Sequence, residues 1–584
     1  MIKLLKNFEK KDYILTFLIL ILIIIQVWLD LKMPDYMSEI TRLVKTEGSK
    51  MPDILYNGGF MLLCSLGSLT STIISGYFLA VLSSHFSSTL RKKLFYKVEE
   101  FSLNEIKNFE TSSLITRTTN DISQVEMFVA MGLQLLIKAP ITAVWAITKI
   151  VNKSFAWSTA TAIAVVILLS VVISLIVIVI PKFKIVQKLI DKLNKVAREN
   201  INGIRVIRAF NAEKYTKTKY ENVNNDLTKQ QLFNQKTFAI MSPLMYLIMN
   251  GLSLAIYVIG SNLIENAGMV DKVGLFGDMI VFSSYSMQII MSFLMLAMIF
   301  TIIPRAQVSA NRINEVLETN STVVDGTFDG NTKTKGTVEF VNVSFKYPDA
   351  KEYILENISF KANKGETIAF IGSTGSGKST LINLVPRFYD VTEGEVLIDG
   401  INVKEYKLEK LYNKLGYVSQ KAVIFNGSVN YNVAFGENGK KKDVKRAVEI
   451  AKAKDFVEEM DEKYNSMLSQ GGTNISGGQK QRISIARAIA REPEIFIFDD
   501  SFSALDYKTD LELRKALKKN IKDATCLIVA QRIGTIMHAD KIIVLDNGKC
   551  VGMGTHEELL KTCDVYKEIA LSQISKEELE HAKA

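Results

Sequence analysis

The sequence predicts a membrane all-α domain of six long transmembrane helices, followed by an α/β domain built around a phosphate-binding loop. Three observations support this prediction. Apolar runs long enough to cross a bilayer recur through the first half of the chain, basic residues crowd between them, and a G-x-x-x-x-G-K-S stretch begins at Gly372 after an apolar run. A chain of 584 residues also exceeds what one hydrophobic core usually supports. We expect a membrane domain with long cytoplasmic helical extensions over residues 1–318, a polar linker over 319–335 and the α/β domain over 336–584.

Composition narrows the class of protein. The chain is 48% hydrophobic yet 23% charged, which suits an apolar part joined to a polar part. Its formal net charge of +10 would suit a nucleic-acid-binding protein, but the Lys and Arg residues lie between apolar runs, where membrane topology places them. We therefore expect a lipid bilayer as a partner, and no nucleic acid. The four cysteines lack paired spacing, so the sequence predicts neither a disulfide framework nor a zinc site.

Six apolar runs are the expected membrane spans. A bilayer core of about 30 Å needs about 20 helical residues. The first run, 14–29, follows several lysines and could open a signal peptide, but no small-residue cleavage site comes after it, so we interpret it as a retained membrane helix. The third is the weakest, since Lys138 and Pro140 interrupt it. The other five expected spans are 60–82, 128–147, 156–180, 238–264 and 279–303.

Charge between the spans predicts their orientation. Two long segments, 83–127 and 181–237, are rich in Lys and Arg, whereas the loop after the fifth span has only Lys272. The positive-inside tendency therefore places both termini and both basic segments in the cytoplasm, as in a multi-pass protein of the cytoplasmic membrane. Apolar residues recur at helical spacing in both segments. We interpret them as membrane helices that continue into the cytoplasm and turn back; a separate amphipathic surface helix is the alternative.

A phosphate-binding loop organises the second domain. The apolar stretch 368–371 predicts a buried strand, and 381–384 predicts the helix that follows the loop. Glycines let backbone N–H groups converge on an anion, Lys378 can reach the terminal phosphates, and Ser379 can ligate Mg²⁺. The candidate nucleoside-triphosphate ligands are Gly372, Ser373, Thr374, Gly375, Ser376, Gly377, Lys378, Ser379 and Thr380. Upstream, Tyr347 could stack on a base, with ordinary core packing as the alternative.

Two further stretches complete the expected site. The apolar stretch 494–498 ends in Asp499, a candidate Mg²⁺ holder, and in Asp500, placed to orient or deprotonate water. A second anion site is expected where Ser476, Gly477, Gly478 and Gln479 open a helix. Two phosphate-facing helix ends in one chain favour a dimer that clamps each nucleotide from both sides.

These motifs resemble, in this order, those of an ABC exporter half-transporter, with six membrane helices followed by one ATP-binding cassette. The match covers nearly the whole chain and includes membrane-half stretches at 114–121 and 202–210. The resemblance implies ATP and Mg²⁺ as cofactors. It makes Gln420 the Q-loop residue, which serves both catalysis and Mg²⁺ binding, and makes residues 475–479 the signature motif and 503–506 the D-loop.

The sequence departs from that family at two positions. Asp500 stands where the family usually places Glu, and Gln531 stands where it places a His that contacts the γ-phosphate. Shortening a carboxylate by one methylene withdraws it by more than about 1 Å, a displacement that can cost about a hundredfold in rate. A Gln amide cannot become cationic. The chain thus resembles the degenerate-site subunit of bacterial heterodimeric multidrug exporters, whose expected partner subunit carries Glu and His at these two positions.

The expected function is ATP-driven export of a small, amphipathic or hydrophobic compound. The alternatives are an ATP-gated channel or regulatory membrane subunit, and a homodimeric lipid or peptide translocase. The span 279–303 offers Met287, Gln288, Met291 and Phe293, a polarizable surface suited to varied apolar compounds. Plain packing or lipid contact is the alternative interpretation of this surface.

Overall fold

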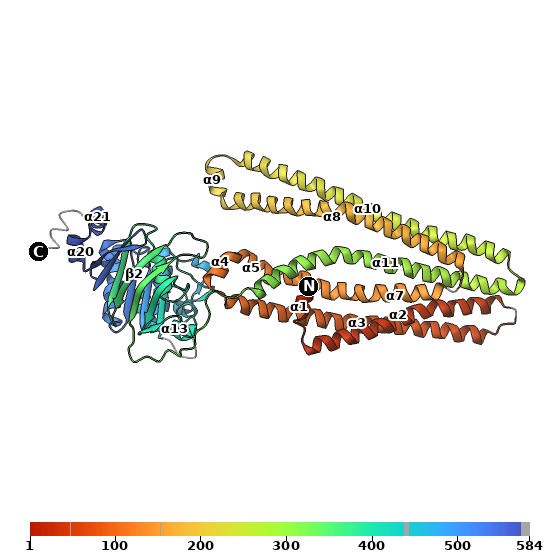
Figure 1. Ribbon diagram of the computed structural model, residues 1–584, viewed down its shortest axis with the longest axis horizontal. Helices are drawn as coiled ribbons and strands as arrows, with labels where there is room; N and C mark the ends of the chain where they lie inside the picture. Colours follow the sequence, from red (N-terminus) through yellow and green to blue (C-terminus); the bar gives the residue numbers. More distant parts are fainter. Residues whose placement is uncertain (47, 152, 437–442, 574–584) are drawn as a thin grey trace. The chain divides into compact units, whose positions relative to one another are not determined.

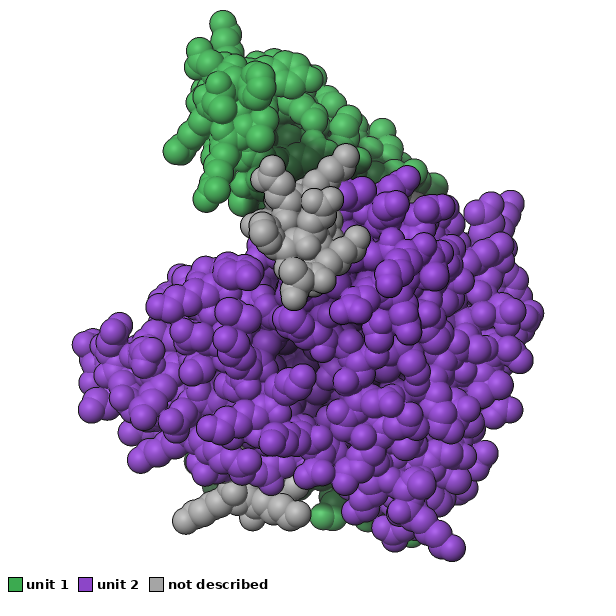
Figure 2. Space-filling model, turned by 90° about the vertical axis from the view of Figure 1, so that its left-hand side faces the viewer, with its two compact units in different colours: residues 1–99, 111–319 green, residues 100–110, 320–584 purple. Residues whose placement is uncertain are grey.

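A computed structural model describes residues 1–46, 48–151, 153–436 and 443–573. The chain divides into two compact units, which Figure 2 shows in separate colours. The first unit comprises Met1–Glu99 and Thr111–Thr319, and the second comprises Glu100–Glu110 and Asn320–Ala584. The domain bounds 1–318, 319–335 and 336–584 stay a prediction. The short segment Glu100–Glu110, which lies in the membrane half of the sequence, packs with the second unit.

The described residues of the first unit form helices and the turns between them, with no strand. Six of its helical stretches are long and apolar enough to cross a membrane, and each contains one of the six apolar runs, so the expected number of spans is confirmed. The third stretch, Thr111–Ile150, includes a π-helical turn and keeps Pro140 within α7. The helices of the first unit are α1 (Ile2–Leu5), α2 (Lys10–Lys45), α3 (Met51–Glu99), α5 (Thr111–Thr118), α6 (Asn120–Met127), the π-turn η1 (Phe128–Gly132), α7 (Leu133–Ile150), α8 (Phe155–Asn202), α9 (Ile204–Ala209), α10 (Glu213–Glu265) and α11 (Met269–Glu318).

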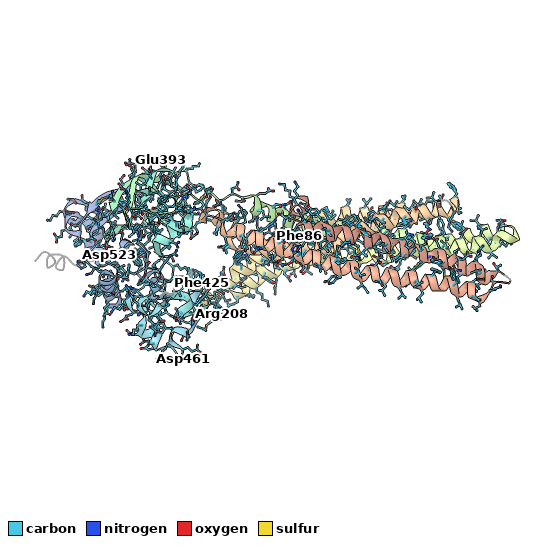
Figure 3. All side chains as sticks on the ribbon, turned by 90° about the horizontal axis from the view of Figure 1, so that it is seen from below. Phe86, Arg208, Glu393, Phe425, Asp461 and Asp523 are labelled. Carbon is cyan, nitrogen blue, oxygen red and sulfur yellow. The ribbon has the colours of Figure 1, made fainter. Side chains whose placement is uncertain are left out.

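The long helices pack in pairs. Helix α2 lies along α3, α8 along α10, and α7 along α11 (Figure 1). The buried face of α3 repeats every three to four residues through Ser68, Ser71, Ser75 and Leu79, and such small side chains let helix backbones approach closely. Nearer the end of α3, Phe86 is fully buried among the helices (Figure 3).

The second basic segment, 181–237, continues the membrane helices of the first unit. Helix α8 runs for 48 residues to Asn202 and α10 for 53 residues from Glu213, with the short α9 between them. The hairpin's turn exposes apolar side chains: Ile201 is 74% exposed and Phe210 is 79% exposed. The basic residues of this segment therefore lie on helices continuous with the spans.

The second unit is α/β. A six-stranded sheet has the order β12-β11-β3-β10-β9-β6. Five of its six strands, β11, β3, β10, β9 and β6, are parallel to one another. A four-stranded antiparallel sheet has the order β2-β1-β4-β5. The strands are β1 (Val338–Phe345), β2 (Leu355–Ala362), β3 (Thr367–Gly372), β4 (Glu393–Ile398), β5 (Ile401–Asn402), β6 (Leu415–Val418), β7 (Gly427–Ser428), β8 (Met467–Leu468), β9 (Ile495–Asp499), β10 (Thr525–Val529), β11 (Lys541–Asp546) and β12 (Lys549–Gly554).

Helices cover the parallel sheet, which is buried on both faces. All five residues of β9 and all five of β10 are buried, as expected for parallel strands between two layers. The predicted fold class is therefore confirmed. The helices are α4 (Leu103–Phe109), α12 (Lys378–Leu384), α13 (Leu408–Lys414), α14 (Val429–Val433), α15 (Val444–Ile450), α16 (Lys454–Glu458), α17 (Gly477–Ile489), α18 (Tyr507–Asn520), α19 (Ile533–Ile536), α20 (His556–Thr562) and α21 (Asp564–Gln573), with 3-10 turns η2 (Lys463–Asn465) and η3 (Gln470–Gly472).

An ion cluster contacts the predicted linker within the second unit. Lys414 Nζ lies 2.8 Å from Asp399 Oδ2 and 2.9 Å from Glu494 Oε2. Asp399 also accepts hydrogen bonds from Thr332 Oγ1 at 3.1 Å and from Thr337 N at 2.9 Å. Removing one partner of such a cluster would leave an uncompensated buried charge, which costs about 3–5 kcal/mol.

Candidate nucleotide-binding site

The candidate site forms where parallel strands end. The phosphate loop follows β3, Asp500 follows β9, Gln531 comes shortly after β10, and Gln420 comes shortly after β6. Because β6, β9, β10 and β3 are neighbours and run parallel, their carboxyl ends meet at one edge of the sheet. Backbone hydrogen bonds extend this alignment: Asp500 N donates to Val529 O at 3.0 Å. The topology thus gathers residues that lie more than a hundred positions apart in the sequence.

The phosphate loop needs glycine where its backbone turns sharply. Gly377, with φ of +95°, precedes α12, and a Cβ there would lie 2.8 Å from Leu355 Cδ2 and 3.0 Å from Ile354 O. At Gly372 a Cβ would lie only 2.0 Å from Leu545 O. Any other residue at either position would push the loop away from the strands behind it. The expected strand, loop and helix are all present.

Lys378 folds back over the loop. Its Nζ donates to Gly372 O at 2.9 Å and to Ser373 O at 2.7 Å, and lies 3.3 Å from Ser376 Oγ. Burial lowers the pKa of Lys378, and the neighbouring carboxylates of Asp500 and Asp499 oppose that shift. A polyphosphate entering the loop would replace these carbonyl contacts with stronger, charge-assisted ones.

A pair of oxygen ligands lies beside the loop. Ser379 Oγ donates to Asp499 Oδ1 at 2.8 Å. Burial raises the pKa of Asp499, which Ser379 opposes and Asp500 reinforces. A hydroxyl and a carboxylate in contact are the hard oxygen donors that Mg²⁺ selects, usually together with substrate phosphates and water. Ser379 and Asp499 therefore fit a Mg²⁺ ion, and the side-chain oxygen of Gln420 is a further candidate ligand.

Two amides hold the Asp500 carboxylate. Gln531 Nε2 donates to Asp500 Oδ2 at 2.8 Å, and Gln420 Nε2 donates to the same oxygen at 3.3 Å. The backbone of Asp500 has φ of +46°, an uncommon left-handed conformation, and Ser503 Oγ donates to its carbonyl at 2.9 Å. Burial raises the pKa of Asp500. The structure therefore brings together the two residues at which the sequence departs from the family it resembles.

Tyr347 lies next to the loop. Its hydroxyl is 3.1 Å from Thr380 Oγ1, in the first turn of α12, and its ring is half-buried. The rings of Phe345 and Tyr389 pack edge-to-face with it, at centroid distances of 5.0 Å and 5.3 Å. A base stacked on Tyr347 would therefore sit close to phosphates held by the loop.

The second expected anion site stands apart from the loop. Ser476 caps α17 through a capping box with Gln479, in which Ser476 N donates to Gln479 Oε1 at 2.8 Å. Ser476 and Gly477 are exposed, and a Cβ at Gly478 would lie 3.3 Å from Ala504 O of the predicted D-loop. Among residues 1–46, 48–151, 153–436 and 443–573, no hydrogen bond or ion pair joins the 476–479 segment to the phosphate loop.

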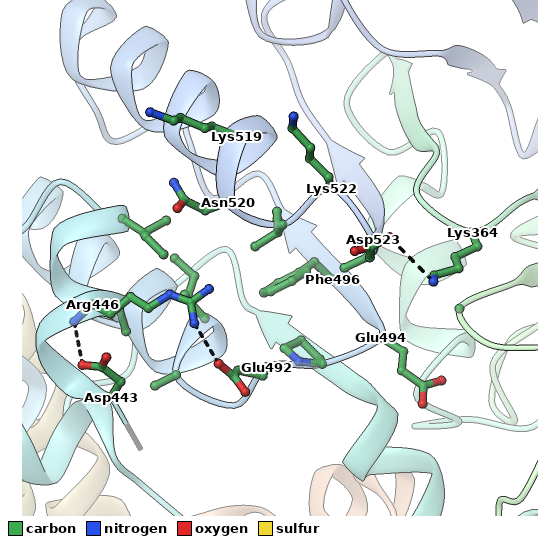
Figure 4. Close-up of a pocket in the computed structure, with 18 of the residues that line it drawn as sticks. Lys364, Asp443, Arg446, Glu492, Glu494, Phe496, Lys519, Asn520, Lys522 and Asp523 are labelled. Atoms are coloured by element: carbon green, nitrogen blue, oxygen red, sulfur yellow. Dashed lines mark hydrogen bonds and ion pairs between the residues drawn. The ribbon is translucent and has the colours of Figure 1, made fainter. Parts of the chain in front are cut away.

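A cavity of about 520 Å³ in this unit lies elsewhere (Figure 4). It is lined by Glu494 and Ala524, which precede β9 and β10, and by ion-paired side chains such as Arg446 and Glu492, 3.1 Å apart. The motifs described above follow the carboxyl ends of the same strands. The cavity is therefore at the opposite edge of the sheet from the candidate site.

Family models match both halves of the chain. Residues 16–293 match the ABC transporter transmembrane region, and residues 355–503 match the ABC transporter model. An uncharacterized ABC transporter ATP-binding protein of Mycobacterium tuberculosis is 38% identical over 524 residues, which cover 88% of this chain and 87% of the relative. This chain belongs to the ABC transporter family. As an ABC exporter half-transporter, it couples ATP hydrolysis to transport across a membrane that it crosses several times.

The chain is also similar to a second curated relative and to a solved structure. A putative multidrug export ATP-binding/permease protein of Bacillus subtilis is 32% identical over 522 residues, 84% of each chain. A solved bacterial Atm1-family ABC exporter with ATP bound aligns with a TM-score of 0.81 at 22% identity, covering 97% of this chain and 99% of the other. At that identity, the structural match is evidence for the fold of this ABC transporter and for nothing more specific.

Sequence reasoning missed one neighbour of the candidate site. Lys107, on α4 in the second unit, places Nζ 5.5 Å from the centroid of the Tyr347 ring. The only local signal was a capped helix, with Ser102 and Glu105 at capping-box spacing. Nothing in that pattern indicates which ring the lysine contacts, because Lys107 and Tyr347 are separated by most of the membrane half.

Proposed function

We propose that this ABC transporter is one subunit of a heterodimeric exporter of the cytoplasmic membrane. Its own phosphate loop, Asp499 and Asp500, together called its Walker side, would then form a slow ATP site. The two hydrogen bonds from Gln531 and Gln420 to one oxygen of Asp500 carry the proposal. A general base must lie within about 2.6–3.2 Å of the proton that it abstracts. Here the carboxylate is one methylene shorter than the family's Glu, two neutral amide donors hold it by one oxygen, Oδ2, and position 531 carries Gln where the family has His. Nucleotide binding does not need that carboxylate.

Each motif has a proposed role. The backbone of residues 372–380 and Lys378 bind the phosphates, Tyr347 stacks on adenine, and Ser379, Asp499 and Gln420 hold Mg²⁺. Asp500 and Gln531 occupy the catalytic positions of the slow site. Ser476, Gly477, Gly478 and Gln479 complete the active ATP site of the partner subunit, which supplies its own Walker residues with Glu and His. The exposure of Ser476 and Gly477 supports a role across a subunit interface.

The purified chain alone is expected to bind ATP with Mg²⁺ but to hydrolyse it slowly, because a homodimer would contain two altered Walker sides. Calorimetric binding and a phosphate-release assay on the same detergent-solubilised sample measure both quantities. Fast hydrolysis by the chain alone, stimulated by a transported compound, would instead establish the homodimeric translocase.

Asp500→Asn is expected to reduce ATP turnover of the two-subunit transporter only about twofold, because hydrolysis resides mainly at the other site. The substitution preserves side-chain size at a buried position. Replacing the partner's corresponding Glu by Gln serves as the comparison and should nearly abolish turnover. A total loss in Asp500→Asn would mean that Asp500 is an essential base.

Two features support an amphipathic or hydrophobic compound as the substrate. One is the Bacillus subtilis relative, a putative multidrug export ATP-binding/permease protein. The other is an open depression on the surface of α11 in the membrane unit, lined by Ser283, Ser284, Met287, Gln288 and Met291. Methionine side chains adapt to varied apolar shapes, and hydroxyl and amide groups serve a polar end.

Transport against a gradient distinguishes a pump from a channel or a regulatory subunit, because only a pump accumulates its substrate. Inverted vesicles containing both subunits should accumulate a fluorescent amphiphile only with ATP and Mg²⁺. Dissipation of a preformed gradient by ATP would instead identify a gated channel.

The orientation proposed here, with both termini cytoplasmic, predicts that protease reaches either end of the chain only from the cytoplasmic side.

A further inference from the structure

Helix α4 is firmly fixed within the second unit. Ser102 N and Oγ both donate to the Glu105 carboxylate, at 3.0 Å and 2.6 Å, and Ser102 Oγ also lies 3.0 Å from Thr322 Oγ1. Although burial raises the pKa of Glu105, the hydrogen bonds from Ser102 and Thr322 outweigh it and hold the pKa below the ordinary value. The rings of Phe101 and Phe109, at either end of the helix, stack at a centroid distance of 5.7 Å. These contacts set the position of the last turn.

That last turn brings a cation to Tyr347. Lys107 Nζ lies 5.5 Å from the ring centroid, within the range of a cation–π interaction. Phe345 and Tyr389 pack around the same ring, and its hydroxyl reaches Thr380. Tyr347 therefore connects a helix from the membrane half of the sequence with the first turn after the phosphate loop. Lys107 itself is exposed.

We propose that Lys107 competes with the nucleobase for the ring of Tyr347, so that ATP binding removes one of the contacts between the last turn of α4 and the rest of the second unit. The proposal rests on the adenine role of Tyr347 given above. The proposal places the Lys107 ammonium and the purine on the same face of the Tyr347 ring, where the two cannot lie at the same time. Lysine can leave readily, because its strongly hydrated charge sits on a flexible four-carbon stem. Thermodynamic linkage makes the effect reciprocal. If bound ATP weakens the contact between Lys107 and Tyr347 by a given factor, that contact weakens ATP binding by the same factor.

Lys107→Ala in the purified full-length chain is therefore expected to bind Mg²⁺–ATP about two- to fivefold more tightly, the equivalent of one exposed cation–π contact. Isothermal titration calorimetry measures the affinity. Inorganic tripolyphosphate, which has no base, controls for the lost charge and should bind the variant no more tightly than the original chain. The matched control is Lys92→Ala, which removes another exposed lysine whose Nζ lies 5.7 Å from a tyrosine ring, that of Tyr96 on α3.

A double-mutant cycle tests the ring itself. With Tyr347→Leu in place, Lys107→Ala should no longer tighten ATP binding, because the shared surface is gone. Weaker ATP binding by Lys107→Ala, or an equal gain for tripolyphosphate, would overturn the competition. An unchanged ATP affinity in Lys107→Ala would also overturn the competition, although the proposed function would stand. Failure of the original chain to bind ATP at all would refute the proposed function instead.

Discussion

ATP hydrolysis by the two-subunit transporter is expected to fall by at least about a hundredfold when Ser476 is replaced by Arg. The Ser476 hydroxyl and the start of α17 are proposed to hold the γ-phosphate at the partner's site, and losing one such preorganised donor typically costs a hundredfold or more. The long Arg side chain would also stand where two cassettes close on the nucleotide. Phosphate release by the co-purified pair measures the effect.

Two controls make this result specific. Thr555→Arg alters another exposed capping-box residue, at the start of α20, and should leave hydrolysis nearly unchanged. Lys378→Ala should weaken nucleotide retention at this chain's own site while leaving residual turnover, because that site contributes little chemistry. Trapped nucleotide distinguishes the two variants. Equal and total loss in Ser476→Arg and Lys378→Ala would mean two equivalent sites and contradict the asymmetric roles.

The double substitution Asp500→Glu with Gln531→His is expected to raise ATP hydrolysis by the chain alone by about a hundredfold. The longer side chain moves the carboxylate by about 1 Å, a displacement worth roughly that factor. Replacing Gln531 by His removes the amide that now donates to Asp500 Oδ2 at 2.8 Å. Rates from a phosphate-release assay, measured at saturating ATP, give the comparison with the original chain.

The same pair of substitutions needs an integrity check, since Asp500 is buried. Unchanged ATP affinity shows that the phosphate loop has survived, and adding Lys378→Ala to the double variant should remove the gained activity. Asp500→Glu alone, with Gln531 still donating, should recover only part of the rate. If the intact double variant hydrolyses ATP no faster than the original chain, these two residues do not limit the slow site.

Much of the fold and of the site's composition could be predicted from the sequence. Six apolar runs predicted six spans, because bilayer thickness fixes the length of a crossing helix. The stretch 368–384 predicted a strand, a loop and a helix, and the loop has glycine at Gly375 and Gly377, where φ is positive. The roles of individual site residues, and the second subunit, stay predictions.

Long-range placement could not be predicted. Capping-box spacing indicates that α4 is a helix but not that it packs with Thr322, since that contact depends on tertiary structure formed across more than two hundred residues. Nor does the sequence indicate that Gln420 and Gln531 reach the same oxygen of Asp500. Their convergence follows from the order of β6, β9 and β10 in the sheet, which a linear pattern does not encode.

The paired helices α8 and α10 also have a mechanical consequence. At 1.5 Å of rise per residue, the 48 residues of α8 extend about 72 Å, whereas the hydrocarbon core accounts for about 30 Å. About 40 Å of the hairpin therefore lies beyond the core, as a lever arm with its pivot in the bilayer. A tilt of about 5° at the pivot would move the tip at α9 by about 3–4 Å. Such amplification converts a small angular change among packed spans into a displacement as large as a side chain.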